Sequence, residues 1–443
     1  MNEQSRHVHR ITEHGDEVIV SQGLCFGAVT LRLSFDRGGA FGPPALTRAV
    51  WDQLERGTAL KTRNQLHGEL EALGASTQWL VSRSSVSIEV STLSDAIGSA
   101  TDLVLESLLR PLEKNRDLKN WREEIDEEQD ALRYEAEWGA ERLFERLWWG
   151  DDRWGIRSVG TRQHRQELSL QALRTHRETL LSARAVVGVA CDPSWRGEGD
   201  ALAQSVLERV RVKAPRGLSL TLSTAPAPPA PGTQRRGVIV YPEAAQAALF
   251  FGTPAPRVDS EDWVIGCLHS LAFGGGFTSP LVQRIRADLG LSYEVGWSTE
   301  SNGLLGQWRG FVAPESHEMN RVLDEVHRLW SDFVRSGPTP EQWRTAQRLM
   351  RSHHLSALST TTSRMRHACA LRLLGLDIAR QTDVLDRASQ STSDDGYRLG
   401  HEFAGAMVDA TIATAQSGEP WLPGARRWFF DTDERQPWAL ATK

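Results

Sequence analysis

The sequence predicts an α+β fold of two similar halves, each a mainly antiparallel sheet with helices packed on one face. The chain has 443 residues, which is enough for two domains with separate cores. A Pro-rich run at residues 225–232 divides it, because such a run favours extended geometry and cannot continue a helix. Strand and helix patterns also recur in the same order on both sides. We predict an N-terminal domain over 1–213, a linker over 214–236 and a C-terminal domain over 237–443.

The first half begins with strands and then alternates with helices. In its second strand Val29, Leu31 and Leu33 alternate with polar residues. Thr62 and Gln65 have capping-box spacing at the start of a helix that Gly74 ends. Strands are expected over 17–20, 28–35, 79–81, 86–90 and 185–190, and helices over 44–56 and 62–73. Two or more long helices are expected after these, one of which carries apolar residues at three- and four-residue spacing: Trp121, Ile125, Leu132, Ala136, Leu143 and Leu147.

The second half repeats this order. An apolar helix is expected over 261–273, followed by a glycine turn and a short helix to Leu289. Thr339 and Gln342 have capping-box spacing with Pro340 at the first helical position. Strands are expected from Val238, over 247–251, near Tyr293, over 304–311 and over 410–415. The tail from Gly418 contains Trp421, Trp428 and Trp438, and is either a strap on the body or a docking surface.

The composition is that of a globular protein, with 40% apolar and 24% charged residues. Its net charge of −6 argues against a dedicated nucleic-acid binder. Cys25, Cys191, Cys267 and Cys369 form no CxxC motif, which favours a reduced compartment. The N-terminus reads as polar, and no apolar run approaches the roughly 20 residues of a membrane span. We therefore expect a cytoplasmic protein with no membrane partner.

Two motifs in the second half carry the functional signal. Residues 274–281 read Gly-Gly-Gly-Phe-Thr-Ser-Pro-Leu, and residues 286–293 read Arg-Ala-Asp-Leu-Gly-Leu-Ser-Tyr. This combination resembles the glycine-rich turn and Arg/Tyr pair of the M16 metallopeptidases (pitrilysin-type, inverted zincins). The resemblance implies two homologous M16-type domains. Pro280 departs from the Arg that is usual there.

Arg286 and Tyr293 match the family's Arg/Tyr pair. The resemblance implies that the Tyr donates a hydrogen bond to the substrate carbonyl as it becomes an oxyanion, and that the Arg holds substrate backbone. The alternative is a solvated helix residue and an ordinary strand aromatic. Tyr is rare in this chain, with 4 against 16 Trp, and one occurs at this position, so we favour the functional interpretation.

The first half resembles the zinc-binding half of the family without its ligands. Where the family has His-x-x-Glu-His, residues 48–52 read Arg-Ala-Val-Trp-Asp. Arg48 and Asp52 therefore stand at the two His positions, Trp51 at the general base and Glu128 at the third ligand. The register rests on Gly57-Thr58, Leu73-Gly74-Ala75, Val159-Gly160-Thr161 and Gly155. Arg stays protonated and Trp accepts no proton, so we expect no metal in this chain.

The degenerate site leaves its pairing open. Arg48 can take the place of the metal and pair with Glu128 or Asp52, or pair with Asp52 as an i, i+4 neighbour on its helix. Glu128 either lies partly buried at the edge of an apolar helix stripe or faces water within the acidic run 123–130. We weigh these alternatives equally.

Other candidate positions are weaker. The family binds substrate at a sheet edge, which the resemblance places at Gln78 and Trp79, where the family has Asn-Ala. His7, His9 and His14 are interpreted as part of a mobile polar tail. His353 and His354 point about 100° apart on a helix, and His317-Glu318 lacks a second His four residues later.

The sequence thus predicts an M16B-like non-catalytic subunit. A partner with His-x-x-Glu-His would hold the zinc, while this chain closes the chamber and presents Arg286 and Tyr293 to a peptide or unfolded polypeptide. The alternatives are a scaffold protein, a stand-alone peptide-binding module and, least favoured, a peptidase with rearranged ligands.

Overall fold

The computed structural model describes residues 7–132, 135–150, 153–217, 235–240, 246–403, 407–413, 426–430 and 437–439. They form two compact units that are each discontinuous in sequence. Unit 1 comprises Met1–Asp126, Arg157–Thr224 and His354–Gln381. Unit 2 comprises Glu127–Ile156, Ala225–His353 and Thr382–Lys443. The Pro-rich run and Trp421 lie outside the described residues.

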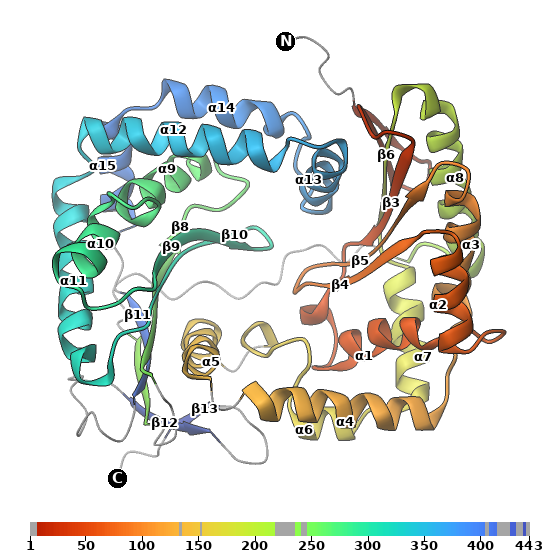
Figure 1. Ribbon diagram of the computed structural model, residues 1–443, viewed down its shortest axis with the longest axis horizontal. Coiled ribbons are helices and arrows are strands. Elements are labelled where there is room, and N and C mark those ends of the chain that lie inside the picture. Colours follow the sequence, from red (N-terminus) through yellow and green to blue (C-terminus); the bar gives the residue numbers. More distant parts are fainter. Residues whose placement is uncertain are drawn as a thin grey trace. The chain divides into compact units, whose positions relative to one another are not determined.

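Unit 1 contains a six-stranded sheet in the order β1-β2-β6-β3-β5-β4 (Figure 1). Only β2 and β6 pair in parallel, and the other neighbours are antiparallel. Its strands are β1 (His7–Ile11), β2 (Glu17–Gln22), β3 (Ala28–Phe35), β4 (Ser76–Val81), β5 (Val86–Leu93) and β6 (Ala185–Cys191). The edge strand β4 therefore belongs to the segment that was expected to bind substrate.

Helices cover both faces of this sheet. One face packs on the main core of unit 1, to which most of the unit's helices contribute. The other face carries α13 (Thr361–Leu373), where Met365 and Cys369 pack on Ile19 and Val186. The remaining helices are α1 (Leu46–Gln53), α2 (Arg63–Ala72), α3 (Ile97–Leu109), α6 (Arg162–Gln166), α7 (Leu170–Leu181) and α8 (Arg196–Lys213). The boundary between the units falls within α4 (Asn115–Leu132).

Unit 2 contains a seven-stranded sheet in the order β13-β12-β7-β11-β8-β10-β9. Its strands are β7 (Arg235–Val240), β8 (Ala248–Ala255), β9 (Val295–Asn302), β10 (Leu305–Val312), β11 (Val408–Ala413), β12 (Arg426–Phe430) and β13 (Pro437–Ala439). The run β7-β11-β8-β10-β9 repeats β2-β6-β3-β5-β4, including the one parallel pair at its start. This confirms that the two halves share an order of elements, and it makes β9 the counterpart of β4.

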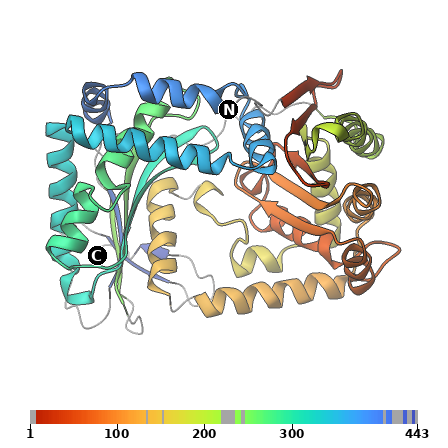
Figure 2. The ribbon, with the colours of Figure 1, turned by 45° about the horizontal axis from the view of Figure 1, so that its top comes forward.

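The helices of unit 2 include one from the first half of the chain. That helix, α5 (Ala136–Trp149), lies along the sheet, as Figures 1 and 2 show, with Phe144 packed on Phe250 at 6.3 Å between ring centroids. The others are α9 (Trp263–Gly274), α10 (Pro280–Val282), α11 (Met319–Ser336), α12 (Pro340–Ala357), α14 (Arg380–Gln390) and α15 (Ser393–Glu402). A π-helix spans Gln283–Asp288.

Several local predictions are confirmed. Thr62 and Gln65 form a capping box at α2, and Thr339 and Gln342 form one at α12. One expectation is wrong: His7 and His9 are not in a mobile tail but in strand β1, where His9 pairs with Glu17 at 2.7 Å.

Among the described helices, none has the length and apolar character to span a bilayer. Short 3₁₀ turns span Gly39–Phe41, Leu54–Arg56, Arg153–Gly155, Pro193–Trp195 and Ser316–Glu318.

Candidate functional site

In unit 1, the residues that stand at the zinc-ligand positions of the similar family bond to each other and to a neighbouring Trp. Arg48 and Asp52 lie one turn apart on α1, and Arg48 Nε donates to both Asp52 carboxylate oxygens at 2.7 Å. Asp52 Oδ2 also accepts from Trp121 Nε1 at 2.8 Å. Of the alternatives left open by the sequence, the i, i+4 pair is the one that forms.

Trp51 belongs to the core of the unit. Its side chain is fully buried, and its ring meets Phe35 edge to face at 6.4 Å between centroids. Its Nε1 donates to the Ser87 carbonyl on β5 at 3.1 Å. The position of the general base in the similar family therefore holds an indole that ties α1 to the sheet.

Glu128 does not join this network. It is exposed on α4, so the hypothesis of a buried pair with Arg48 is wrong and the interpretation that it faces water is confirmed. The physical reason is that Glu128 stands at the edge of the apolar stripe, where a carboxylate remains hydrated at no desolvation cost. In the part of the chain that the structure describes, no group of three or more His, Cys, Asp and Glu side chains could hold a metal ion.

Gln78 and Trp79 lie on the edge strand β4, on opposite faces of the sheet. Gln78 is exposed and stands opposite Glu89 on β5, while Trp79 stands opposite Ile88. The Trp79 ring is half-buried against the core of unit 1. It therefore packs on the core face of the strand rather than projecting from it.

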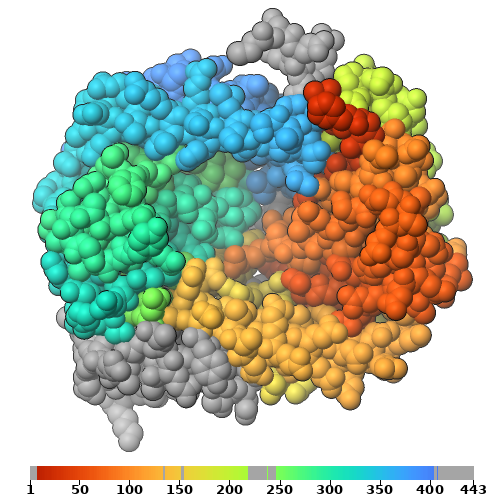
Figure 3. Space-filling view, in the orientation of Figure 1, coloured from red at the N-terminus to blue at the C-terminus, as the bar shows by residue number. Residues whose placement is uncertain are grey.

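Arg286 and Tyr293 are brought together in unit 2. Arg286 lies in the π-helix, and Tyr293 lies two residues before β9. The guanidinium carbon of Arg286 is 4.1 Å from the centroid of the Tyr293 ring, which is 77% exposed. Figure 3 shows the segment that carries them, in green, at the surface of unit 2. An exposed cation–π pair of this kind is worth about 0.5–1 kcal/mol.

Phe277, which the sequence reasoning did not single out, is the third member of this cluster. Its ring centroid is 5.1 Å from the Arg286 guanidinium carbon, and the side chain is 62% exposed. The signal available in the sequence was an aromatic residue within the glycine turn, where an apolar side chain has no core to enter. We call Phe277, Arg286 and Tyr293 the aromatic–arginine cluster.

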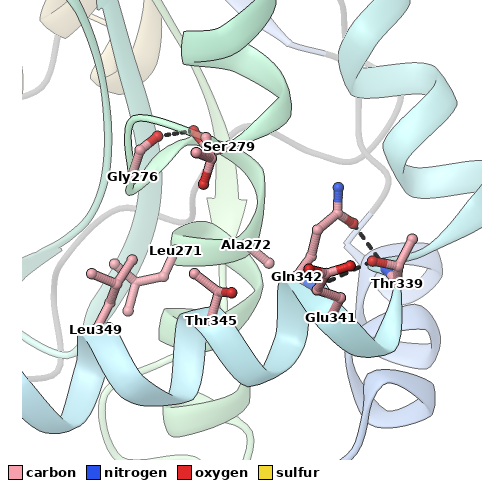
Figure 4. A pocket seen from close by; sticks show the side chains of 10 residues that line it. Leu271, Ala272, Gly276, Ser279, Thr339, Glu341, Gln342, Thr345 and Leu349 are labelled. Atoms are coloured by element: carbon pink, nitrogen blue, oxygen red, sulfur yellow. Dashed lines mark hydrogen bonds between the residues drawn. The ribbon is translucent and has the colours of Figure 1, made fainter.

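The glycine turn that holds Phe277 is fixed by packing and hydrogen bonds. A Cβ at Gly274 would lie 2.5 Å from Trp297 Cβ, so the close approach of α9 to β9 requires glycine there. The carbonyl of Gly276 accepts from both Ser279 N, at 3.0 Å, and Ser279 Oγ (Figure 4). A cavity of about 280 Å³ borders this turn, between α9 and α12.

The π-helix distinguishes this segment from its counterpart in unit 1. Before β4, Ala75 N donates to Leu70 O five residues earlier, past Gly74 at φ +58°. Before β9, Leu291 N donates to Ile285 O six residues earlier, past Gly290 at φ +60°. Unit 2 thus accommodates one more residue in this turn, where Arg286 lies. Insertions of this type are common at functional sites.

Comparison with known proteins finds similarity to peptidases and to an inactive relative of peptidases. Residues 168–350 match the family model described as Peptidase M16 inactive domain. An uncharacterized zinc protease of Streptomyces coelicolor is 23% identical over 423 residues, covering 91% of this chain and 89% of that protein. The non-peptidase homolog YmxG of Helicobacter pylori is 23% identical over 150 residues, which cover 34% of this chain and 35% of that protein.

Solved structures share the fold. A peptidase M16 inactive domain from Pseudomonas fluorescens superposes with a TM-score of 0.82 at 17% identity, covering 94% of this chain and 100% of that one. A protease from Helicobacter pylori superposes with a TM-score of 0.76 at 13% identity, covering 92% and 99%.

Proposed function

We propose that this chain is an inactive-type member of the M16 peptidase family and serves as the non-catalytic subunit of a two-chain zinc peptidase. The observation that carries the proposal is the contact between Arg286 and the exposed Tyr293, with the guanidinium carbon 4.1 Å from the centroid of the phenol ring. Unit 1 supports it, because Arg48 and Asp52 bond to each other and Trp51 is buried. The zinc and the water that it activates would come from a partner with His-x-x-Glu-His.

Each residue of the pair has a separate role in this proposal. The Tyr293 hydroxyl donates a hydrogen bond to the carbonyl oxygen of the peptide as negative charge develops on it. Arg286 orients the peptide before that step. The stacking of the guanidinium on the phenol ring keeps both groups on one face of unit 2, so that a single bound segment can contact both.

The test is peptide hydrolysis by this chain mixed with an M16 protein that carries His-x-x-Glu-His from the same source, beside each chain alone. We expect activity only in the mixture. Tyr293→Phe should reduce kcat on the order of 10²-fold. Tyr397→Phe is the matched control, because Tyr397 is 44% exposed on α15 of the same unit and its ring meets His401 edge to face instead.

The outcomes separate the alternatives. Activity in the mixture that survives Tyr293→Phe would remove Tyr293 from the mechanism. No activity in any mixture, together with peptide binding by this chain alone, would favour a stand-alone peptide-binding module. Activity from this chain alone would contradict the assignment of the zinc ligands to a partner.

A further inference from the structure

Arg286 is unusual among the arginines that the structure describes in having ring contacts but no acceptor. Among the described residues, no carboxylate, carbonyl or hydroxyl accepts a hydrogen bond from it, and its contacts are the rings of Phe277 and Tyr293. Two other arginines of unit 2 pair with acids: Arg257 with Asp259 at 2.9 Å, and Arg398 with Asp262 at 2.8 Å. The N–H groups of Arg286 are therefore left for a ligand.

The neighbours of Arg286 in the π-helix are already engaged. Arg284, two residues before it, pairs with Glu325 on α11 at 3.3 Å. Asp288, two residues after it, accepts from Gln283 Nε2 at 2.9 Å. The same short segment thus contains one arginine that is neutralised within the fold and one that is not.

The chemistry of the aromatic–arginine cluster selects the ligand. A guanidinium presents planar N–H donors that match a carboxylate, and the rings restrict its motion at little entropic cost. Phe277 and Tyr293, exposed by 62% and 77%, offer apolar surface beside it. A carboxylate next to an apolar side chain satisfies both features.

The position of the cluster favours a peptide over a free anion. Tyr293 lies two residues before β9, which is the last strand on its side of the described sheet. The outer backbone groups of such a strand can pair with an extended chain.

We propose that the aromatic–arginine cluster recognises a carboxylate of an extended peptide, with Arg286 as its ligand-binding residue and Phe277 as a positioning residue for the guanidinium. The proposal deepens the proposed function and rests on its assignment of Arg286 to the substrate. It names the substrate class as peptides that carry a carboxylate beside an apolar residue. The carboxylate can be a Glu or Asp side chain or the peptide's C-terminus.

The experiment measures equilibrium binding of three fluorescent peptides to the full chain at low salt. The first is a short Ser/Thr/Val peptide with one internal Leu-Glu pair and an amidated end. The second has Gln in place of Glu, and the third is the Gln peptide with a free C-terminal carboxylate. We expect at least one charged peptide to bind about three- to tenfold more tightly than the neutral one, with a smaller difference at high salt.

Variants locate this preference. Arg286→Gln should abolish it, and Phe277→Leu should reduce it while preserving apolar bulk. Arg284→Gln is the matched control, since it removes the same charge from the same helix and leaves Glu325 paired with Arg328. It should keep the preference. The charged peptide that gains affinity identifies the source of the carboxylate.

Equal binding of the three peptides, or a preference that survives Arg286→Gln, would overturn the proposal. These results are distinguishable from failure of the proposed function. A mixture that hydrolyses peptides without carboxylate preference would retain the subunit role and reject this inference. A preference in the isolated chain with no hydrolysis in any mixture would do the reverse.

Discussion

Arg48 on α1 of unit 1 and Arg286 in the π-helix of unit 2 are both partly exposed arginines on short helices. Arg48 bonds to Asp52 on its own helix, and Asp52 in turn accepts from Trp121. Arg286 contacts only two exposed rings among the described residues. Arg48 is thus paired with an acid of its own helix, whereas Arg286 has no hydrogen-bond acceptor among the described residues.

The difference does not come from the framework beneath the two regions. In unit 1 the buried Trp51 on α1 donates to a carbonyl of β5 at 3.1 Å. In unit 2 the buried Trp308 on β10 donates to the Gly266 carbonyl on α9 at 3.0 Å. Both regions therefore rest on a helix tied to its sheet by an indole N–H, and the divergence lies in the side chains at the surface.

The largest expected effect comes from a substitution at the degenerate zinc site of unit 1, formed by Arg48, Trp51 and Asp52. Trp51→Ala should lower the free energy of unfolding by about 3–5 kcal/mol, because it opens a cavity in a fully buried position and removes a buried hydrogen bond. Urea denaturation measures this, with Trp79→Ala as the control in a half-buried position. A loss no larger than that of Trp79→Ala would show that unit 1 does not depend on the filled site.

The next effect is a pH dependence of stability, which comes from one buried histidine in each unit. His176 bonds to Thr47 on α1 at 2.8 Å, and burial lowers its pKa to about 4. His269 on α9 stacks on Trp308, and burial lowers its pKa to about 3. Between these values and the unfolded pKa of about 6.5, only the unfolded chain binds the proton, so stability falls as pH decreases through this window.

When the pH is lowered from 7 to 5, each of these histidines should lower the free energy of unfolding by about 2 kcal/mol. His269→Leu should remove the part that belongs to unit 2 and leave the part of His176. Urea denaturation of both proteins at the two pH values measures the difference. An unchanged pH dependence in the variant would mean that His269 protonates within the folded state.

A smaller effect tests the hydrogen bonds of Asp52 at the degenerate zinc site. Asp52→Ala removes the acceptor of Trp121 Nε1 and of Arg48, and should cost about 1–2 kcal/mol, mostly from the buried indole donor. Glu128→Ala on the neighbouring α4 should change stability by less than about 0.5 kcal/mol, because that carboxylate is exposed. Thermal unfolding compares the two, and equal losses would contradict the assigned network.

The smallest effect on stability is expected at the aromatic–arginine cluster of unit 2. Tyr293→Phe and Phe277→Leu should each change the free energy of unfolding by less than about 0.5 kcal/mol, since both side chains are exposed. Chemical denaturation beside the binding and hydrolysis assays measures this. A loss above 1.5 kcal/mol would show that the cluster serves folding, and would remove the contrast between the two regions.

Local signals in the sequence predicted much of this molecule. Apolar alternation found the strands, and capping boxes at Thr62 and Thr339 found helix starts. The recurring order of elements predicted the repeat, because each half buries the same kind of sheet face. The family resemblance singled out Arg286 and Tyr293, and Gly290, at φ +60°, lies in the turn between them.

Features set by distant contacts were not accessible. The sequence gives α5 and α13 the periodicity of ordinary amphipathic helices, and periodicity does not say on which sheet a helix packs. Phe277 lies outside any periodic element, and a π-turn has no reliable pattern of its own. The exposure of Glu128 was undecided because a residue at the edge of an apolar stripe can face either way.

The placement of α13 has a consequence for how the protein is made. Glu17 is buried in unit 1 and pairs with Arg372 across 355 residues of chain, and Glu89 pairs with Arg366 at 2.9 Å. A ribosome adding about 5–20 residues per second reaches Arg372 roughly 20–70 s after Glu17. Until then unit 1 has two carboxylates without these cations and a sheet face without its helix. The first part of the chain to be synthesised is therefore completed only near the end of translation.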